Sequence, residues 1–275
     1  MSEKTTEFLL PDEVVKSSDC APVDLVIISQ PKMGKSSIFG DFTLHNNAVV
    51  LSLECGGYQY IDARKMEIYT SNETTYFEAF RNYMGMRDAL LKNKGKYEFL
   101  LVDGLSDLDA LSSLGGTYDY MQTAIGKSFN KDVKTGEVYK FGDEKFKLVT
   151  TLPDGNGYQH TRNWFLKQID IFRQIAPKRI FAAHIQDKLL RDGGKEEVSG
   201  SELALTGKLK TIFAAKVTAL GKLVADENKR YLNFQVQNDG IIAGSRSPHL
   251  KDKILISEMS KEGTLKSYWD NIYKC

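Results

Sequence analysis

The stretch that decides the fold is Asp24-Leu25-Val26-Ile27-Ile28, followed by Ser29-Gln30-Pro31-Lys32-Met33-Gly34-Lys35-Ser36-Ser37. Residues 24–28 form a short apolar, β-branched run that is typical of a buried strand. Residues 29–37 predict a tight loop that ends in Gly-Lys-Ser and opens a helix at about Lys35. A strand, a loop and a helix in this order are the context that a phosphate-binding loop requires.

The residue types of this loop suit a bound triphosphate. The first turn of a helix offers backbone N–H donors and the positive end of its dipole. Gly34 lets the backbone approach an anion, Lys35 supplies a point charge, and the Ser36 hydroxyl is a ligand for Mg²⁺. We therefore predict ATP and Mg²⁺ as ligands. The predicted nucleotide-binding residues are Ser29, Gln30, Pro31, Lys32, Met33, Gly34, Lys35, Ser36 and Ser37.

The loop departs from the usual pattern G-x-x-x-x-G-K-[ST] at one position, because Ser29 stands where the first glycine belongs. Serine tolerates a positive φ less well than glycine, so we expect a slightly different start of the loop. A second Gly-Lys-Ser, at residues 126–128, has no β-rich run before it and lies in a polar, lysine-rich stretch. We interpret it as an ordinary loop. For Gly34-Lys35-Ser36 the alternative is that the tripeptide occurs there by chance as well.

Composition sets the limits on function. The chain has 275 residues, 41% hydrophobic and 27% charged, with a formal net charge of +1. These values are typical of a globular protein and exclude a strongly basic footprint, so a nucleic-acid site must be a local patch. The three cysteines, Cys20, Cys55 and Cys275, suggest neither a disulfide framework nor a zinc site. The apolar run at residues 8–10 is too short for a signal or membrane span, so a cytoplasmic protein is expected.

Three further apolar runs predict buried strands, at residues 48–53, 99–102 and 179–183. Helices are predicted at 73–92, 160–175 and 206–213, and further strands at 216–224 and 231–237. The helix at 160–175 should turn Trp164, Phe165, Ile169, Phe172 and Ile175 inward. Continuous apolar strands separated by helices favour an α/β, three-layer fold with a mostly parallel central sheet.

Polar residues stand at the ends of these strands, where the carboxyl ends of a parallel sheet gather functional groups. Asp103 is predicted to hold Mg²⁺ together with Ser36, although an aspartate at a strand end is also a common turn residue. Hydrolysis needs a carboxylate that orients the attacking water. No carboxylate stands directly after Asp103, because Gly104 occupies that position. We therefore assign the role to Glu54, which follows the predicted strand at 48–53, and the alternative is that Glu54 is a surface carboxylate at a turn.

His184 and Gln186 follow the fourth strand. A polar side chain there can touch the γ-phosphate and report its loss, and a hydrogen-bonded structural histidine is the alternative. The predicted catalytic set is therefore Glu54, Lys35 and His184. Arg246 and Lys208 are weaker candidates for a cation supplied to a neighbouring subunit, because most such side chains are simply solvated.

Residues 117–158 form a polar region in which cations and aromatic rings alternate, a mixture that suits single-stranded nucleic acid. Acidic residues dilute its charge, and a solvated hairpin whose rings cover its own core is the alternative. A turn is expected at residues 134–137. The cations and rings are Tyr118, Tyr120, Lys127, Phe129, Lys131, Lys134, Tyr139, Lys140, Phe141, Lys145 and Lys147.

Taken together, the loop at 29–37, the strand end Leu51–Gly57, the run Phe99–Asp103 and the run Ile180–His184 resemble the RecA-type ATPase core. The chain most resembles phage-encoded RecA-like/AAA P-loop ATP-binding proteins related to RadA and KaiC, some of which act in single-strand annealing or recombination. The resemblance implies ATP hydrolysis, homo-oligomers with nucleotide at subunit interfaces, often single-stranded DNA binding, and the host cytoplasm as the compartment. It also matches Glu54 to the family's catalytic carboxylate, Asp103 to its Mg²⁺ aspartate and His184 to its sensor.

The expected organisation is a polar lead-in at 1–22, a RecA-like ATPase domain at 23–255 with the inserted polar region 117–158, and a tail at 256–275. The expected function is that of a Mg²⁺-dependent ATPase in phage DNA recombination, annealing or replication. The alternative is a nucleotide-dependent switch or assembly ATPase without nucleic-acid binding. A small-molecule phosphotransferase is disfavoured, because the sequence shows no pocket for an accepting hydroxyl group.

Overall fold

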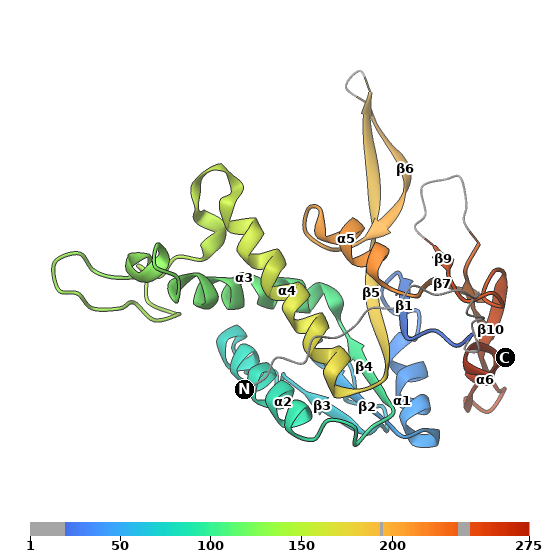
Figure 1. Ribbon diagram of the computed structural model, residues 1–275. Helices are drawn as coiled ribbons and strands as arrows, with labels where there is room; N and C mark the ends of the chain where they lie inside the picture. The colour runs from blue at the N-terminus through green and yellow to red at the C-terminus, as the bar shows by residue number, and fades with distance from the viewer. Residues whose placement is uncertain (1–19, 193–194, 236–242, 275) are drawn as a thin grey trace, which may run out of the picture.

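The fold is an α/β arrangement in which one large sheet lies between two layers of helices (Figure 1). The computed structural model describes residues 20–192, 195–235 and 243–274. Within that part the sheet has 11 strands in the path β11-β10-β8-β7-β1-β5-β4-β2-β3, with β6 on β5 and β9 on β7. The predicted three-layer fold with a mostly parallel sheet is confirmed. The predicted lead-in at 1–22 lies almost entirely outside the described residues.

The parallel core contains the four predicted strands, with β1 paired to β5, β5 to β4 and β4 to β2. One strand therefore separates the P-loop strand from the strand that ends in Asp103. The bounds of these strands are β1 Asp24–Ser29, β2 Ala48–Ser52, β3 Lys65–Glu67, β4 Phe99–Asp103, β5 Lys178–Asp192 and β7 Ala219–Asp226.

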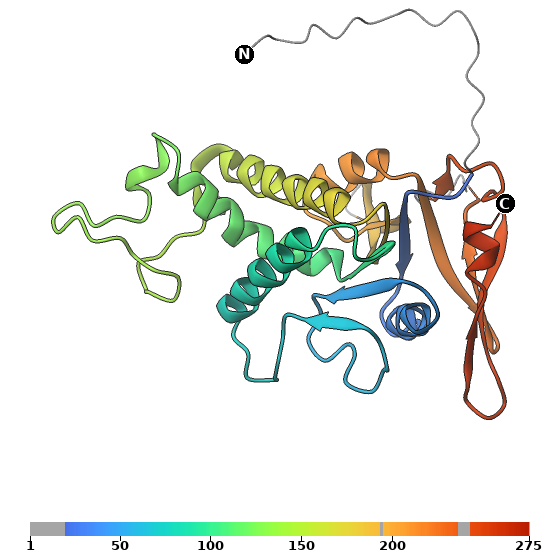
Figure 2. The same cartoon turned by 60° about the horizontal axis from the view of Figure 1, so that its bottom comes forward.

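Both faces of the core strands are buried, which explains their continuous apolar sequences. In β1, Val26 and Ile28 face the helices α2 to α5, whereas Leu25 and Ile27 face α1 and the C-terminal segment. The turned view in Figure 2 shows α1 apart from the longer helices α2, α3 and α4. The C-terminal segment with α6 packs on the same side as α1. The helices are α1 Lys35–His45, α2 Tyr76–Lys92, α3 Leu105–Met121, α4 Asn156–Ile175, α5 Leu209–Lys216 and α6 Asp270–Tyr273. The five residues predicted to face inward from α4 are all buried.

The helix α3 is absent from the sequence-based expectation. It runs over Leu105–Met121 and packs on α4 through Gly115 and Gly116, where added Cβ atoms would meet Trp164 and the backbone of residues 160–161. Glycine at these two positions lets the helices approach closely. The segment therefore owes its helical structure to packing more than to helix propensity.

An antiparallel extension follows the parallel core. It consists of β8 Lys229–Asn233, β10 Lys253–Met259 and β11 Leu265–Ser267, with β9 Gly244–Ser245 beside β7. β10 runs through residue 255, so the segment expected as a tail at 256–275 continues the sheet. Trp269 and Tyr273 then pack on Phe42 of α1.

Two hairpin-like projections leave this body (Figure 1). The second half of β5 pairs with β6 Lys195–Leu203 in a long antiparallel hairpin. Residues 122–148, which we call the arm, extend between α3 and α4 and contain the short helix Gly126–Ser128, so the second Gly-Lys-Ser is indeed no phosphate loop. The turn expected at 134–137 is present, with a bridge between Lys131 and Val138. The 3-10 turns Val149–Thr151 and Pro153–Gly155 connect the arm to α4.

Among the cysteines of the described residues, Cys55 is free and exposed. Cys20 is disulfide-bonded, a pairing that its position in the sequence did not suggest.

Candidate active site

The P-loop connects β1 to α1 and ends in a left-handed residue. Gly34 is the N-cap of α1 with φ 89°, and no side chain caps the first turn. Lys32 also has a positive φ of 63°. Left-handed residues in such a loop turn successive N–H groups toward one side, and the uncapped first turn leaves its own donors available. The loop therefore has the backbone form of an anion-binding site.

Lys35 is buried, and its ammonium group lies among polar partners. Its Nζ donates to Ser29 Oγ at 3.0 Å and lies 3.4 Å from His184 Nδ1. Burial lowers the pKa of Lys35, an effect that the negative charges of Glu54 and Asp103 oppose. The serine that replaces the usual first glycine thus holds the lysine side chain, a role that the motif alone does not reveal.

Glu54 and His184 form a close pair that reaches across β4, since Glu54 follows β2 and His184 lies within β5. Glu54 Oε1 lies 3.0 Å from His184 Nε2, and each side chain is about one quarter exposed, at 27% and 26%. The hydrogen bond to His184 lowers the pKa of Glu54, and the charge of Lys35 adds to this effect. Glu54 is therefore an ionised carboxylate that solvent can reach, as a residue that orients water must be.

Asp103 is 1% exposed at the end of β4, and its two oxygens have different surroundings. Oδ2 accepts a hydrogen bond of 2.8 Å from the Tyr58 hydroxyl, whereas Oδ1 is buried without a partner among the described residues. Burial and, secondarily, Glu54 raise the pKa of Asp103, while the hydroxyls of Ser36 and Tyr58 and the charge of Lys35 oppose that rise. A buried acceptor without a donor, beside the Ser36 hydroxyl, fits a water molecule held by Mg²⁺.

No group of three or more His, Cys, Asp or Glu side chains in the described part of the chain could hold a metal ion. Mg²⁺ in nucleotide sites usually takes one or two protein ligands and completes its shell with water and phosphate oxygens. This coordination pattern is met by Ser36 and Asp103, so the residues present fit a Mg²⁺ ion.

A cavity of about 400 Å³ lies against Lys35, Ser36, Glu54 and His184. Its size suits part of a nucleotide, since ligand pockets span roughly 300–1,000 Å³. Its walls come from the P-loop, from the segment that follows β2 and from His184 within β5. The lining residues are Pro31, Lys32, Gly34, Lys35, Ser36, Ser37, Glu54, Gly57, Ile61 and His184.

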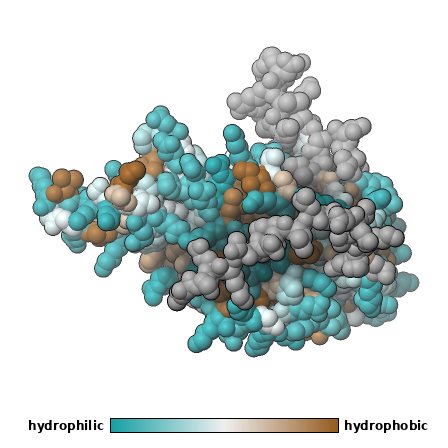
Figure 3. All heavy atoms as spheres, viewed as in Figure 1, coloured by the Kyte–Doolittle hydropathy of each residue, from teal (hydrophilic) through white to brown (hydrophobic). Residues whose placement is uncertain are grey.

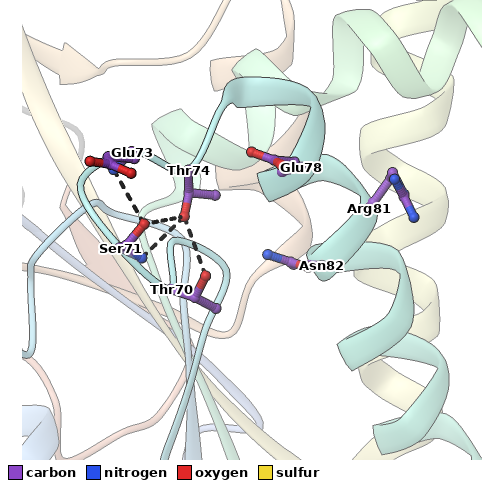
Figure 4. Close-up of a pocket in the computed structure, with 7 residues that line it drawn as sticks. All are labelled: Thr70, Ser71, Glu73, Thr74, Glu78, Arg81 and Asn82. Carbon is purple, nitrogen blue, oxygen red and sulfur yellow. Dashed lines mark hydrogen bonds between the residues drawn. The ribbon is translucent and has the colours of Figure 1, made fainter.

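A larger cavity, of about 560 Å³, lies between the β3–α2 connection and the first turns of α2 (Figure 4). Its polar groups bind one another: Ser71 N donates to Thr74 Oγ1 at 3.1 Å, and Glu73 N donates to Ser71 Oγ at 3.3 Å. Because none of its residues comes from the P-loop or from the ends of β4 and β5, size alone does not identify the site.

The structure thus brings the predicted catalytic residues Lys35, Glu54 and His184 together and places Asp103 beside them. Gln186, Arg246 and Lys208 lie elsewhere, and a contact of Arg246 or Lys208 with the phosphates of a neighbouring subunit stays a prediction. Gln186 donates to Glu202 at 2.9 Å, and Arg246 donates to the Ala215 carbonyl at 2.8 Å. Lys208 lines a different cavity, together with Asp109 and Arg162.

Three residues that sequence reasoning missed adjoin the site. Arg230 of β8 donates to the Met33 carbonyl at 2.8 Å and packs on Gly34. Tyr58 binds Asp103. Asp107, one turn beyond Asp103, has its pKa raised to about 6 by burial and by Glu54. The sequence carries no motif for Arg230 or Tyr58, whereas the carboxylate four residues after Asp103 is a signal that could have been followed.

The aromatic rings of the arm are largely engaged within the protein. Phe141 stacks on Phe77 of α2 with ring centroids 5.1 Å apart, and Phe146 lies 6.3 Å from Tyr118. Tyr139 donates to Asp132 at 2.6 Å. The structure therefore favours the alternative in which these rings cover their own core, whereas the lysines of the arm are exposed.

A family model for an AAA domain matches residues 21–247 of the chain. A search of curated proteins finds no match. Among solved structures, one similar chain is described as the crystal structure of the RadB recombinase, with a TM-score of 0.41 and 11% identity over 90% of this chain and 92% of that chain. No helix of the described part is long and apolar enough to cross a membrane. Because the family match spans most of its length, this chain belongs to the AAA domain family of P-loop nucleotide-binding proteins.

Proposed function

We propose that the protein is a Mg²⁺-dependent ATPase that converts ATP and water to ADP and phosphate. The observation that carries the proposal is the continuous row of contacts from Ser29 through Lys35 and His184 to Glu54, along the wall of the P-loop cavity. The Lys35 ammonium group, which binds phosphate, and the ionised Glu54 carboxylate are thereby held on either side of one side chain, His184. This separation is what an in-line attack of water on a terminal phosphate needs.

In this proposal, the loop amides and Lys35 bind the phosphates, and Ser36 and Asp103 hold Mg²⁺. Glu54 orients the attacking water and accepts its proton. His184 touches both Lys35 and Glu54, so it can register whether the terminal phosphate is present. Mg²⁺, when bound, neutralises charge that develops on the phosphate oxygens.

The test is ATP turnover of Glu54→Gln beside nucleotide affinity. We expect turnover to fall about 10²-fold or more, because a general base contributes about 10²–10⁴-fold, with affinity for ATP retained. Glu73→Gln, in the larger polar cavity, is the matched control and should leave turnover unchanged. Equal turnover in all three proteins would remove Glu54 from the chemistry.

We further propose that the ATPase acts on single-stranded DNA in phage recombination, annealing or replication. Support comes from the RecA-like resemblance and from the lysines of the arm, Lys127, Lys131, Lys134, Lys140, Lys145 and Lys147. Single-stranded DNA should then raise ATP turnover, and the stimulation should weaken as salt rises. Turnover that ignores DNA across a range of salt concentrations would contradict this role.

A nucleotide-dependent assembly protein is the second candidate, and one observation favours it. Two apolar side chains of the arm are strongly exposed, Ile125 at 83% and Val133 at 100%, on a projection whose surface mixes hydrophobic and hydrophilic patches (Figure 3). Exposed apolar groups on such a projection suit contact with another copy. Gel filtration with and without ATP should then show ATP-dependent oligomers, and monomers under both conditions would exclude this candidate.

A further inference from the structure

Tyr58 connects the loop between β2 and β3 to the end of β4. Its side chain is completely buried, and its hydroxyl donates a hydrogen bond of 2.8 Å to Asp103 Oδ2. Forty-five residues of sequence separate the two partners. The contact therefore depends on the fold and has no local motif.

The position of the Tyr58 hydroxyl is fixed by the rest of the residue. The ring belongs to the core cluster that includes Ile38, Phe39 and Phe42 of α1. The Tyr58 carbonyl accepts a hydrogen bond of 2.6 Å from Lys65 Nζ, which also lies 5.9 Å from the centre of the ring. With both ring and backbone held, the hydroxyl can reach Asp103 but has little freedom to turn away.

Tyr58 is the donor in this contact, because its hydroxyl carries the proton and the Asp103 oxygen accepts it. Burial raises the pKa of Tyr58 well above its usual value, and the charge of Asp103 raises it further.

The hydrogen bond also makes the two oxygens of Asp103 different. Oδ2 is occupied by Tyr58, and Oδ1 remains without a partner among the described residues. Residues that hold a ligand carboxylate in one orientation help to set the metal affinity of a site. Their loss typically lowers that affinity about 10- to 100-fold. We propose that Tyr58 is a positioning residue of the Mg²⁺ site, whose hydroxyl orients Asp103 so that Oδ1 faces the ion and its water shell. The inference rests on the proposed function, in which Asp103 holds Mg²⁺.

Tyr58→Phe separates this role from plain packing, because phenylalanine keeps the ring and removes only the hydroxyl. The matched control is Tyr83→Phe. Tyr83, on α2 and outside the P-loop cavity, is also completely buried. Its hydroxyl donates to Gln168 Oε1 of α4 at 3.0 Å. Both variants lose one buried tyrosine hydrogen bond, so a general loss of stability affects them alike.

The experiment measures binding of a fluorescent ATP analogue in EDTA and over a titration with Mg²⁺, together with direct Mn²⁺ binding followed by electron paramagnetic resonance. For Tyr58→Phe we expect unchanged affinity in EDTA, and metal concentrations at half-saturation raised about 10-fold or more. Tyr83→Phe should match the wild type in every measurement, and Asp103→Asn should lose the metal dependence.

Metal titrations of Tyr58→Phe that coincide with those of the wild type and Tyr83→Phe would overturn the proposal. Equal losses in both tyrosine variants would also overturn it, since they would indicate a packing effect. A wild-type protein whose nucleotide affinity ignores Mg²⁺ would instead remove the proposed function itself. If Tyr58→Phe fails to fold, the comparison is repeated with Gly85→Ala present, because the added methyl group meets open space on α2 and should stabilise the helix.

Discussion

The ammonium group of Lys35 lies between the Ser29 hydroxyl and the His184 ring, inside the P-loop. Lys35→Ala should lower ATP turnover about 10²-fold or more, as expected when one donor to a transition state is removed. The measurement is steady-state phosphate release, with Lys94→Ala, in the exposed turn after α2, as the control. Near-normal turnover would be inconsistent with the role assigned to Lys35.

Asp107 should make stability depend on pH. Burial and Glu54 raise its pKa from 3.8 to about 6, so the folded protein binds a proton more tightly than the unfolded chain does. The carboxylate thus costs stability above pH 6, and the cost disappears as pH falls through about 4. Asp107→Asn should raise the free energy of unfolding by about 1–3 kcal/mol at pH 8, since one pKa unit corresponds to about 1.4 kcal/mol.

Chemical denaturation of both proteins between pH 4 and 8 checks the effect of Asp107. The difference between variant and wild type should shrink steadily below pH 6. A difference that stays constant over this range would show that the substitution acts through packing alone.

The residues of the candidate site that follow the apolar runs of the parallel strands are predictable from the sequence, because parallel strands bring their carboxyl ends to one edge. Glu54, Asp103 and His184 were located in this way. Tyr58 and Arg230 could not be located, since each reaches the site through tertiary packing. A tyrosine after two glycines, or an arginine in a strand between two antiparallel neighbours, looks the same in the sequence wherever its side chain points.

At the level of elements, the contact between α3 and α4 allows a sharp comparison of two glycines. Gly115→Ala should destabilise the protein although alanine favours helices, because its methyl group would overlap the Trp164 ring. Gly85→Ala, in the middle of α2, meets nothing within 4 Å and should stabilise by about 0.5–1 kcal/mol. Thermal unfolding of both variants measures the two effects, and shifts of the same sign would contradict the packing argument.

The same contact explains which elements were predictable. Helix α4 shows a clear apolar stripe and was predicted, with its start placed at 160 instead of Asn156. Helix α3 was missed because Leu105–Met121 contains serines, aspartates and two adjacent glycines. Its propensity is poor, and its partner is distant in sequence. Strands β10 and β11 were missed for a related reason, since β10 is only partly buried and β11 has three residues, none of them buried.

For the whole molecule, the C-terminal segment closes the face of the sheet that carries α1. Trp269 is 6% exposed, and its ring centroid lies 4.6 Å from that of Phe42. Trp269→Ala should therefore destabilise the entire fold by about 3–5 kcal/mol. Tyr60→Ala, at a residue that is 90% exposed, should change stability by less than about 0.5 kcal/mol.

Urea denaturation followed by circular dichroism is the measurement for Trp269→Ala. We expect a single transition that moves to lower urea concentration. A separate early transition, with the main one unmoved, would show that the C-terminal segment folds independently of the nucleotide-binding core.

Strand β5 has a mechanical consequence. It is one continuous strand of 15 residues, and His184 is its seventh residue, where parallel pairing with β1 gives way to antiparallel pairing with β6. The eight residues beyond His184 extend about 26 Å at about 3.3 Å per residue. A tilt of about 5° at His184 would displace the far end by about 2 Å over that length. A small change in the direction of β5 at His184, next to Glu54, would therefore move Asp192 at the far end of the strand much further than it moves the site itself.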